Sequence, residues 1–111
     1  MNNPPIKNLL EFQYLTYKHK SICFYLSTPE CSVCKVLKPK VIEMLKDYFP
    51  QIHFCYVDLN EAKEIRGQLS VFSVPTILVY FEGKETIRIS RNVLLEELRE
   101  QIDRYYKMIF P

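Results

Sequence analysis

The sequence lacks both a long hydrophobic run and a long block of like charge. Its first twenty residues predict neither a signal peptide nor a membrane-spanning segment, because Lys7, Glu11, Lys18, His19 and Lys20 interrupt their short apolar groups. The formal net charge is only +2, from 15 basic and 13 acidic side chains, which gives no electrostatic support for nucleic-acid binding. We therefore expect a cytoplasmic protein that binds neither nucleic acid nor a membrane.

The length and composition are those of one domain, residues 1–111, which we expect to act as a monomer. A chain of 111 residues that is 48% hydrophobic can bury a core without covalent cross-links. Its four cysteines are therefore not needed as a scaffold, and in a reducing compartment paired cysteines more often serve catalysis or metal binding. We expect the polar, proline-containing segment Met1–Pro5 to be a loosely ordered tail.

Cys31 and Cys34 form a Cys-x-x-C pair within the stretch TPECSVCKVLKPKV, residues 28–41. An apolar run of strand length precedes this pair, and apolar residues at helical spacing follow it. We therefore expect the pair where a strand ends and an amphipathic helix begins. Free backbone N–H groups and the positive end of the helix dipole stabilise a thiolate at such a place and lower its pKa. Two cysteines at this spacing are either a redox pair or half of a metal site.

Hydrophobic periodicity along the whole chain predicts four helices and four strands, in the order α-β-α-β-α-β-β-α. The expected helices cover residues 9 to about 18–20, the stretch from the Cys-x-x-C pair to residue 48, residues 60–69 and residues 92–106. The expected strands cover residues 21–27, 52–58, 77–81 and 84–90. Together these elements form one mixed α/β sheet, with parallel crossovers first and an antiparallel hairpin last.

Polar residues and turns mark the ends of several of these elements. Asn60 or Asp58 is expected to cap the third helix, and Asn92 is expected to cap the last one. Glu82-Gly83 is a two-residue hairpin turn between the last two strands. A further strand around Ile6 has little support in the sequence and would bring the number of strands to five.

Four motifs occur in a fixed order along the chain. They are Cys31-Ser-Val-Cys34-Lys35, Pro39 five residues after the second cysteine, Val74-Pro75-Thr76 before a strand, and Phe81-Glu-Gly-Lys84 at the hairpin. Their order and spacing resemble those of the thioredoxin superfamily. The resemblance covers roughly residues 21–106. It implies the thioredoxin fold, an α/β fold whose mixed four- to five-stranded sheet is flanked by helices on both faces. It also implies a cis peptide bond before Pro75, with the Val74 backbone offered to an extended substrate segment.

Several positions depart from the pattern that thioredoxins usually show. Glu30 replaces the tryptophan before the first cysteine, Ser32-Val33 replaces Gly-Pro, Tyr25 replaces a buried aspartate, Tyr56 replaces the lysine that faces it, and Arg91 replaces a glycine of the last groove loop. The chain contains no tryptophan. A tyrosine with a pKa near 10 cannot replace the carboxylate as a base at neutral pH. These departures indicate a thioredoxin-like protein rather than a housekeeping thioredoxin.

For function, the resemblance implies a thiol–disulfide oxidoreductase that needs no cofactor and no metal. Cys31 would attack a disulfide and Cys34 would resolve the mixed disulfide that results. The expected substrate-binding residues are Glu30, Val74, Pro75 and Arg91. The partners would be a disulfide-containing protein or small molecule and an unidentified reductant. The alternative is a non-enzymatic thioredoxin-fold adaptor or redox sensor with low turnover.

A metal site would need further ligands besides the Cys-x-x-C pair. His19, His53, Cys23 and Cys55 could supply them, but none of these residues has paired spacing, so a zinc site is disfavoured. We interpret Cys23 and Cys55 as core thiols. In the thioredoxin arrangement they lie on neighbouring strands and point to opposite faces of the sheet, so they cannot pair directly.

Two further groups of side chains have alternative interpretations. Lys35 and Lys38 lie within one turn of Cys34 and either support thiolate formation or belong to an ordinary solvated helix face. Five tyrosines fall on or beside apolar stripes and are interpreted as core or half-core residues rather than as an aromatic binding surface. They are Tyr14, Tyr17, Tyr48, Tyr105 and Tyr106.

Overall fold

The computed structural model describes residues 5–111, so the expected tail falls, apart from Pro5, outside the described residues. The elements follow the predicted order. They are α1 (Leu9–Lys18), β1 (Ser21–Ser27), α2 (Ser32–Tyr48), β2 (His53–Asp58), α3 (Lys63–Gln68), β3 (Thr76–Phe81), β4 (Lys84–Ser90) and α4 (Leu95–Ile109). Within this part of the chain, no helix is long and apolar enough to cross a membrane.

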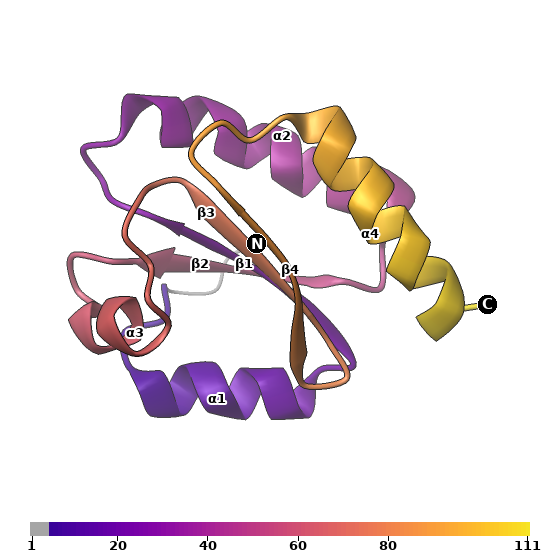
Figure 1. The fold of residues 1–111 in the computed structure, drawn as a ribbon, viewed down its shortest axis with the longest axis horizontal. Coiled ribbons are helices and arrows are strands. Elements are labelled where there is room, and N and C mark those ends of the chain that lie inside the picture. Colours follow the sequence, from indigo (N-terminus) through magenta and orange to yellow (C-terminus); the bar gives the residue numbers. More distant parts are fainter. Residues whose placement is uncertain (1–4) are drawn as a thin grey trace.

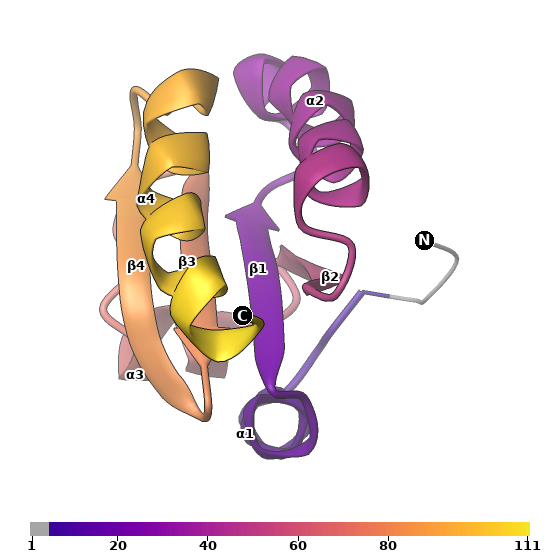
Figure 2. The ribbon, with the colours of Figure 1, turned by 90° about the vertical axis from the view of Figure 1, so that its right-hand side faces the viewer.

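The four strands form one mixed sheet in the order β2-β1-β3-β4. Strands β1 and β2 are parallel, whereas β3 is antiparallel to both β1 and β4. Helices α2 and α4 cover one face of the sheet and α1 and α3 cover the other (Figures 1 and 2). The predicted fold class is therefore confirmed. Ile6 makes only an isolated parallel bridge to Val57, so the sheet has four strands in the described residues.

Strand β1 lies at the centre of the molecule, and all seven of its residues are buried. Its side chains alternate between two cores, as the pleat of a strand requires. Cys23 and Tyr25 belong to the core under α2 and α4, whereas Ile22, Phe24 and Leu26 belong to the core under α1 and α3. A strand that is buried on both faces reads as a continuous apolar run, and residues 21–27 form such a run.

The predicted hairpin turn joins β3 and β4. Glu82 and Gly83 both have positive φ values, +52° and +81°, as a two-residue turn that matches the twist of its strands requires. Strand β4 is the edge strand, with Ile87 buried and Arg88 exposed, in agreement with the predicted alternation. A register shift between Val79 and Tyr80, which the sequence did not predict, interrupts the pairing of β3 with β4.

The predicted helix caps are wrong. Helix α3 follows Ala62 and has no side-chain cap, because the Asp58 carboxylate accepts a hydrogen bond from the Asn60 backbone N–H in the preceding turn. Helix α4 follows Leu94, so Asn92 lies outside it, and this helix too has no side-chain cap. In both places non-helical residues separate the polar residue from the first helical residue.

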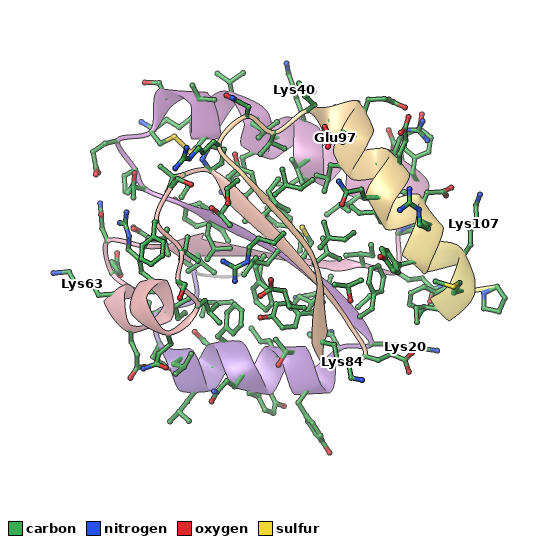
Figure 3. All side chains as sticks on the ribbon, viewed as in Figure 1. Lys20, Lys40, Lys63, Lys84, Glu97 and Lys107 are labelled. Atoms are coloured by element: carbon green, nitrogen blue, oxygen red, sulfur yellow. A yellow bond between two sulfur atoms is a disulfide. The ribbon has the colours of Figure 1, made fainter. Side chains whose placement is uncertain are left out.

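The tyrosine prediction is wrong for three residues and right for two. Tyr14, Tyr17 and Tyr48 are exposed, whereas Tyr105 and Tyr106 are half-buried against the core under α2 and α4. Helix α1 fully buries only Phe12, so its other aromatic side chains lie on the solvent side. Charged side chains also lie on the solvent side: Figure 3 shows Lys40, Lys63 and Lys107 extending away from the body of the protein.

His19 and His53 stack where the end of α1 meets the start of β2, with ring centroids 4.1 Å apart. Burial lowers the pKa of His19, and the charges of His53 and Lys18 lower it further. Burial and Lys18 likewise lower the pKa of His53. The unfolded chain therefore binds protons more readily than the folded protein, so the stability that the neutral pair provides is lost as pH falls below about 6.5.

We expect the free energy of unfolding of the wild type to fall between pH 7 and pH 5. The fall should be smaller in a variant in which both histidines are replaced by asparagine. Urea denaturation of the wild type and of the His19→Asn/His53→Asn variant at several pH values measures this. Equal pH slopes for the two proteins would show that other groups cause the acid sensitivity. The His19→Asn single variant tests the charge repulsion between the two rings. Its free energy of unfolding should fall less between pH 7 and pH 5 than that of the wild type.

Candidate active site

Cys31 and Cys34 form a disulfide at the start of α2, with their Cα atoms 5.3 Å apart. Cys31 is the N-cap residue, and its sulfur accepts a hydrogen bond from the Cys34 backbone N–H at 3.2 Å. The predicted placement at the junction of a strand and a helix is confirmed. Cys31 is half-buried, whereas Cys34 is 2% exposed, so an attacking group reaches Cys31 more readily.

The surroundings of Cys31 favour a negative charge on its sulfur. The first turn of α2 contains no acidic residue, so the positive end of the helix dipole is not neutralised there. In the reduced protein a Cys31 thiolate would accept the same backbone hydrogen bond that its sulfur accepts in the disulfide. Lys35, which follows the pair directly, is exposed to solvent.

Tyr25 lies behind the disulfide, in the place where the family resemblance puts an aspartate. Its hydroxyl donates a hydrogen bond to the Cys34 carbonyl at 2.7 Å. Burial raises the pKa of Tyr25 to about 12, with a further contribution from Tyr56, so its hydroxyl is neutral at physiological pH. Tyr25 therefore anchors the first turn of α2 but offers no base to the buried Cys34 thiol.

Tyr56 lies level with Tyr25 on the neighbouring strand β2, as predicted, and the two rings are 6.4 Å apart. The Ser27 hydroxyl donates a hydrogen bond to the Tyr56 hydroxyl at 3.0 Å. The Lys38 ammonium lies over the Tyr56 ring, 4.2 Å from its centroid, and Lys38 is half-buried. The structure thus distinguishes the two lysines after the cysteine pair, because Lys35 is solvated and Lys38 is held against the site.

The Val74–Pro75 peptide bond is cis, and Pro75 is buried. Val74 and Cys31 pack against the same core under α2 and α4. The Pro75 carbonyl accepts a hydrogen bond from the Arg91 backbone N–H at 2.9 Å, so the loops that contain these residues are joined. Arg91 itself is exposed and has a positive φ of 66°, a backbone conformation that glycine adopts more easily.

Glu30 is not paired with Arg91. Its carboxylate accepts a hydrogen bond from the Asn60 side chain at 2.8 Å, and no ion pair or hydrogen bond between Glu30 and Arg91 occurs in residues 5–111. The Glu30–Asn60 bond instead links the loop before α2 to the loop after β2. The candidate substrate-binding residues therefore occupy separate loops around the disulfide.

An apolar groove next to the disulfide was missed in the sequence. A cavity of about 580 Å³ lies between α2 and the segment that follows β4. Its lining is Val33, Val36, Leu37, Lys40, Arg91, Asn92, Val93 and Leu94. Val33, Val36 and Leu94 are 66%, 62% and 63% exposed, and the lining contains two cations and no carboxylate. The available signal was that Val33 and Val36 lie off the buried stripe of α2.

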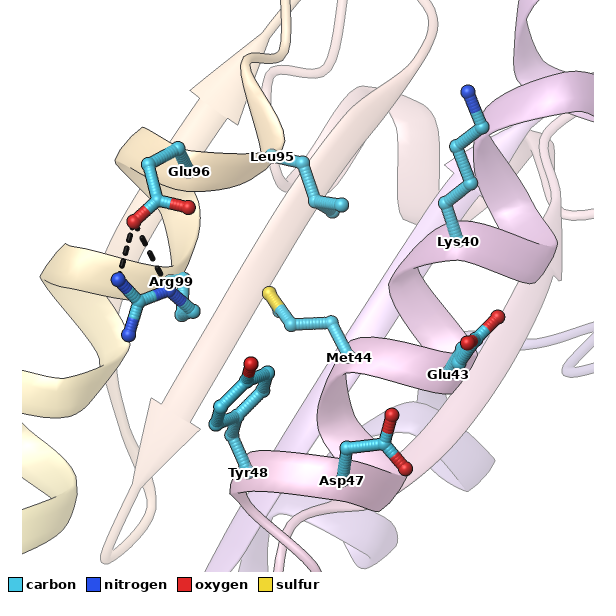
Figure 4. Close-up of a pocket in the computed structure, with 8 residues that line it drawn as sticks. All are labelled: Lys40, Glu43, Met44, Asp47, Tyr48, Leu95, Glu96 and Arg99. Carbon is cyan, nitrogen blue, oxygen red and sulfur yellow. Dashed lines mark hydrogen bonds and ion pairs between the residues drawn. The ribbon is translucent and has the colours of Figure 1, made fainter.

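A second cavity, of about 350 Å³, lies farther along the seam between α2 and α4 (Figure 4). Met44 and Tyr48 line it from α2, and Leu95 and Arg99 line it from α4. The Arg99 guanidinium lies over the Tyr48 ring, 5.4 Å from its centroid, and also pairs with Glu96. Arg99 and Glu96 therefore engage each other at one side of this cavity, whereas Lys40, Glu43 and Asp47 also line it.

Cys23 and Cys55 are free thiols on opposite faces of the sheet, as predicted. Burial raises the pKa of Cys23 to about 12 and that of Cys55 to about 11. His19, His53 and Cys55 line one cavity, but no group of three or more potential ligands in residues 5–111 is arranged to hold a metal ion. Cys23 cannot join that group, because it lies on the other face of the sheet.

In the reduced protein we expect iodoacetamide to label Cys31 rapidly near neutral pH and the other three cysteines slowly. Cys31 is accessible and lies at a helix start, whereas Cys34 is buried and the thiolates of Cys23 and Cys55 are disfavoured by burial. Peptide mapping by mass spectrometry measures the order of labelling, and labelling in urea provides the control. Faster labelling of Cys34 than of Cys31 would overturn the assignment of their roles.

The architecture and the disulfide at a helix start define a thioredoxin-fold protein with a redox-active Cys-x-x-C pair. The family model for thioredoxin matches residues 7–104, and the chain belongs to the thioredoxin family. It is 30% identical over 103 residues to the thioredoxin-like protein YdfQ of Bacillus subtilis (strain 168), covering 93% of this chain and 91% of that protein. It is 28% identical over 80 residues to thioredoxin-2 of Pyricularia oryzae, covering 72% of this chain and 46% of that protein.

Solved structures agree with this assignment. Fasciola hepatica thioredoxin has a TM-score of 0.81 and 26% identity, with 92% of this chain and 98% of that chain covered. Oxidised mitochondrial thioredoxin 3 from Saccharomyces cerevisiae has a TM-score of 0.81 and 22% identity, with 90% of this chain and 92% of that chain covered. This second likeness supports the fold alone. Family membership and the Cys31–Cys34 pair together support thiol–disulfide oxidoreductase activity and do not favour a non-enzymatic adaptor.

Proposed function

We propose that the protein is a protein-disulfide oxidoreductase in which Cys31 is the nucleophile and Cys34 the resolving thiol. The observation that carries this proposal is the Cys31–Cys34 disulfide at the start of α2, with Cys31 more accessible than Cys34. A thiol at a helix start that is open to solvent suits the first attack on a substrate, because the helix end stabilises its thiolate. A buried thiol within bonding distance suits the second, intramolecular step.

The proposed reaction consists of two thiol–disulfide exchanges. The Cys31 thiolate attacks one sulfur of a substrate disulfide, which forms a mixed disulfide and releases the other substrate sulfur as a thiolate. Cys34 then loses its proton and attacks the Cys31 sulfur, which forms the observed disulfide and releases the second substrate thiolate. The substrate gains two electrons and the protein loses two. An external thiol or dithiol reductant returns the protein to its reduced form, and no cofactor takes part.

For the substrate site we propose Glu30, Val74, Pro75 and Arg91, together with the apolar groove. The joined loops of Pro75 and Arg91 support this proposal, as does the continuity of the groove with the cysteine pair through Val33. Apolar walls and two cations fit an extended segment with apolar side chains and a carboxylate. Glu30 would act on the opposite side, through the loop that Asn60 holds.

We further propose that the protein works as a single-domain monomer in a reducing, cytoplasmic compartment. A single sheet with a core on each face supports a single folding unit. A Cys-x-x-C pair at a helix start in a chain whose core needs no covalent cross-link fits a reducing compartment. Size-exclusion chromatography with light scattering tests the oligomeric state.

The function is tested by insulin reduction in dithiothreitol, with separate serine variants of the two site cysteines. The wild type should accelerate insulin precipitation, Cys31→Ser should abolish the acceleration, and Cys34→Ser should accumulate a mixed disulfide at Cys31 that mass spectrometry detects. Cys23→Ser, which changes a buried thiol away from the disulfide, is the matched control and should retain activity. A wild type no faster than dithiothreitol alone would contradict enzymatic function and leave redox sensing as the alternative.

A further inference from the structure

The resolving step requires a base or a charge that the usual thioredoxin pattern does not supply here. Cys34 is 2% exposed, and a buried thiol resists ionisation. Tyr25 occupies the place of the family's buried aspartate, and its hydroxyl is neutral and donates to the Cys34 carbonyl. Tyr56 occupies the place of the family's lysine. A positive side chain beside Cys34 must therefore come from an element other than strands β1 and β2.

Lys38 lies four residues after Cys34 on α2, so the two side chains are neighbours on one face of the helix, with Cβ atoms about 6 Å apart. Side chains in a helix lean towards its N-terminus, which directs Lys38 back over the turn that contains Cys34. Its ammonium is fixed 4.2 Å from the centroid of the Tyr56 ring, which faces Tyr25. The contact keeps the charge close to the first turn of α2 instead of in bulk solvent.

We propose that Lys38 is a positioning residue for the resolving step, which it promotes by stabilising the Cys34 thiolate. The proposal rests on the proposed function of Cys34 as the resolving thiol. Cys34 releases its proton to water, the thiolate forms beside the Lys38 ammonium, and the thiolate then attacks Cys31 in the mixed disulfide. The Cys31–substrate bond breaks as the Cys31–Cys34 bond forms, and the substrate leaves as a thiolate. In a half-buried setting, a single charge about one helical turn away changes the ionisation equilibrium of a thiol by about tenfold.

The other titratable or charged groups around Cys34 are less suited to this role. Tyr25 and Tyr56 face it from β1 and β2, and Tyr25 is neutral at physiological pH. Lys35 is exposed on α2, and Arg91 is exposed after β4. On the loops, Glu30 accepts a hydrogen bond from Asn60, and the buried Asp58 accepts one from the Asn60 backbone. Asp58 is the buried carboxylate of β2, so it is the competing candidate for a base.

The test is the rate of resolution as a function of pH, measured in single turnover. Reduced protein is mixed with a disulfide peptide, quenched in acid, and the Cys31 adduct is followed by mass spectrometry between pH 6 and pH 9.5. In Lys38→Gln the pH midpoint of resolution should rise by about one unit, which slows resolution about tenfold at pH 7. Lys38→Arg keeps the charge and should stay close to the wild type. Lys35→Gln, which removes an exposed lysine of the same helix, is the matched control and should change little.

Two results would overturn the role of Lys38. The first is a Lys38→Gln profile identical to that of the wild type, and the second is an equal upward shift in Lys38→Gln and Lys38→Arg, which would indicate packing on Tyr56 rather than charge. Asp58→Asn should leave the midpoint unchanged; if it alone moves the midpoint, the carboxylate sets the ionisation of Cys34. A failure of the underlying function looks different, because the wild type would then form no Cys31 adduct at any pH.

Discussion

Replacing Tyr25 with aspartate is expected to speed resolution of the mixed disulfide at pH 7 by about 100-fold, the lower end of the range for general-base catalysis. The wild type has no base at this position, since burial raises the pKa of Tyr25 to about 12 and its hydroxyl is a donor to Cys34. Burial would raise the pKa of a carboxyl group there towards neutrality, which suits proton transfer from a thiol. The wild-type rate should therefore rise steadily from pH 7 to above pH 8.5, whereas the variant should level off earlier.

The same acid-quench time course measures this effect. Tyr25→Phe is the matched control, because it removes the hydroxyl without adding a base and should not speed resolution. The aspartate variant should also unfold at a lower urea concentration, since a buried carboxyl group without full hydrogen bonding costs free energy. A flat pH profile for the wild type, with no accumulated adduct, would show that another group or a water chain already supplies the base.

Replacing Phe24 with alanine is expected to lower the free energy of unfolding by about 3–5 kcal/mol, the usual cost of removing a buried aromatic ring. Phe24 is fully buried in the core under α1 and α3. Its ring stacks on Phe12 at a centroid distance of 4.1 Å and meets Tyr80 edge-on at 5.6 Å. The substitution would remove both aromatic contacts and leave a cavity in the middle of this core.

Urea denaturation measures this loss, and Phe72→Ala is the matched control. Phe72 is 80% exposed, so its truncation should change stability little. Phe24 and Tyr25 are adjacent in sequence but face opposite cores. The folded Phe24→Ala protein should therefore keep the wild-type pH profile of resolution. A changed profile would mean that the two faces of the sheet are coupled.

Most of the fold could be predicted because the relevant signals are local. The burial of β1 on both faces produces a continuous apolar run. The composition of Glu82-Gly83 alone identifies the turn between β3 and β4. The helix caps could not be predicted, because Asp58 and Asn92 could each cap a helix or serve in a turn, and tertiary packing decides which. The register shift at Val79 likewise has no local signature in the sequence.

The sequence predicted the redox pair of the site, but not the groove beside it or the position of Lys38. The spacing of Cys31 and Cys34 was sufficient to place the disulfide, because the strand and the helix on either side were both clear. The apolar groove was missed since it joins α2 to a segment that is distant in sequence. The position of Lys38 could not be distinguished from that of Lys35 by spacing, because only the fold places the Tyr56 ring beneath it.

The position of the two free thiols limits how many electrons the native protein can exchange. Cys23 and Cys55 are separated by the thickness of the sheet backbone, each in its own core. Both thiols are buried and they lie on opposite faces of the sheet, so they cannot form a disulfide with each other in the folded protein. The folded protein therefore forms one internal disulfide, although its sequence has four cysteines. A redox titration of the native protein should therefore fit a single two-electron couple. Cys23 and Cys55 can pair only after the sheet has unfolded. A second internal disulfide would therefore indicate unfolding of the protein and not a more oxidising environment.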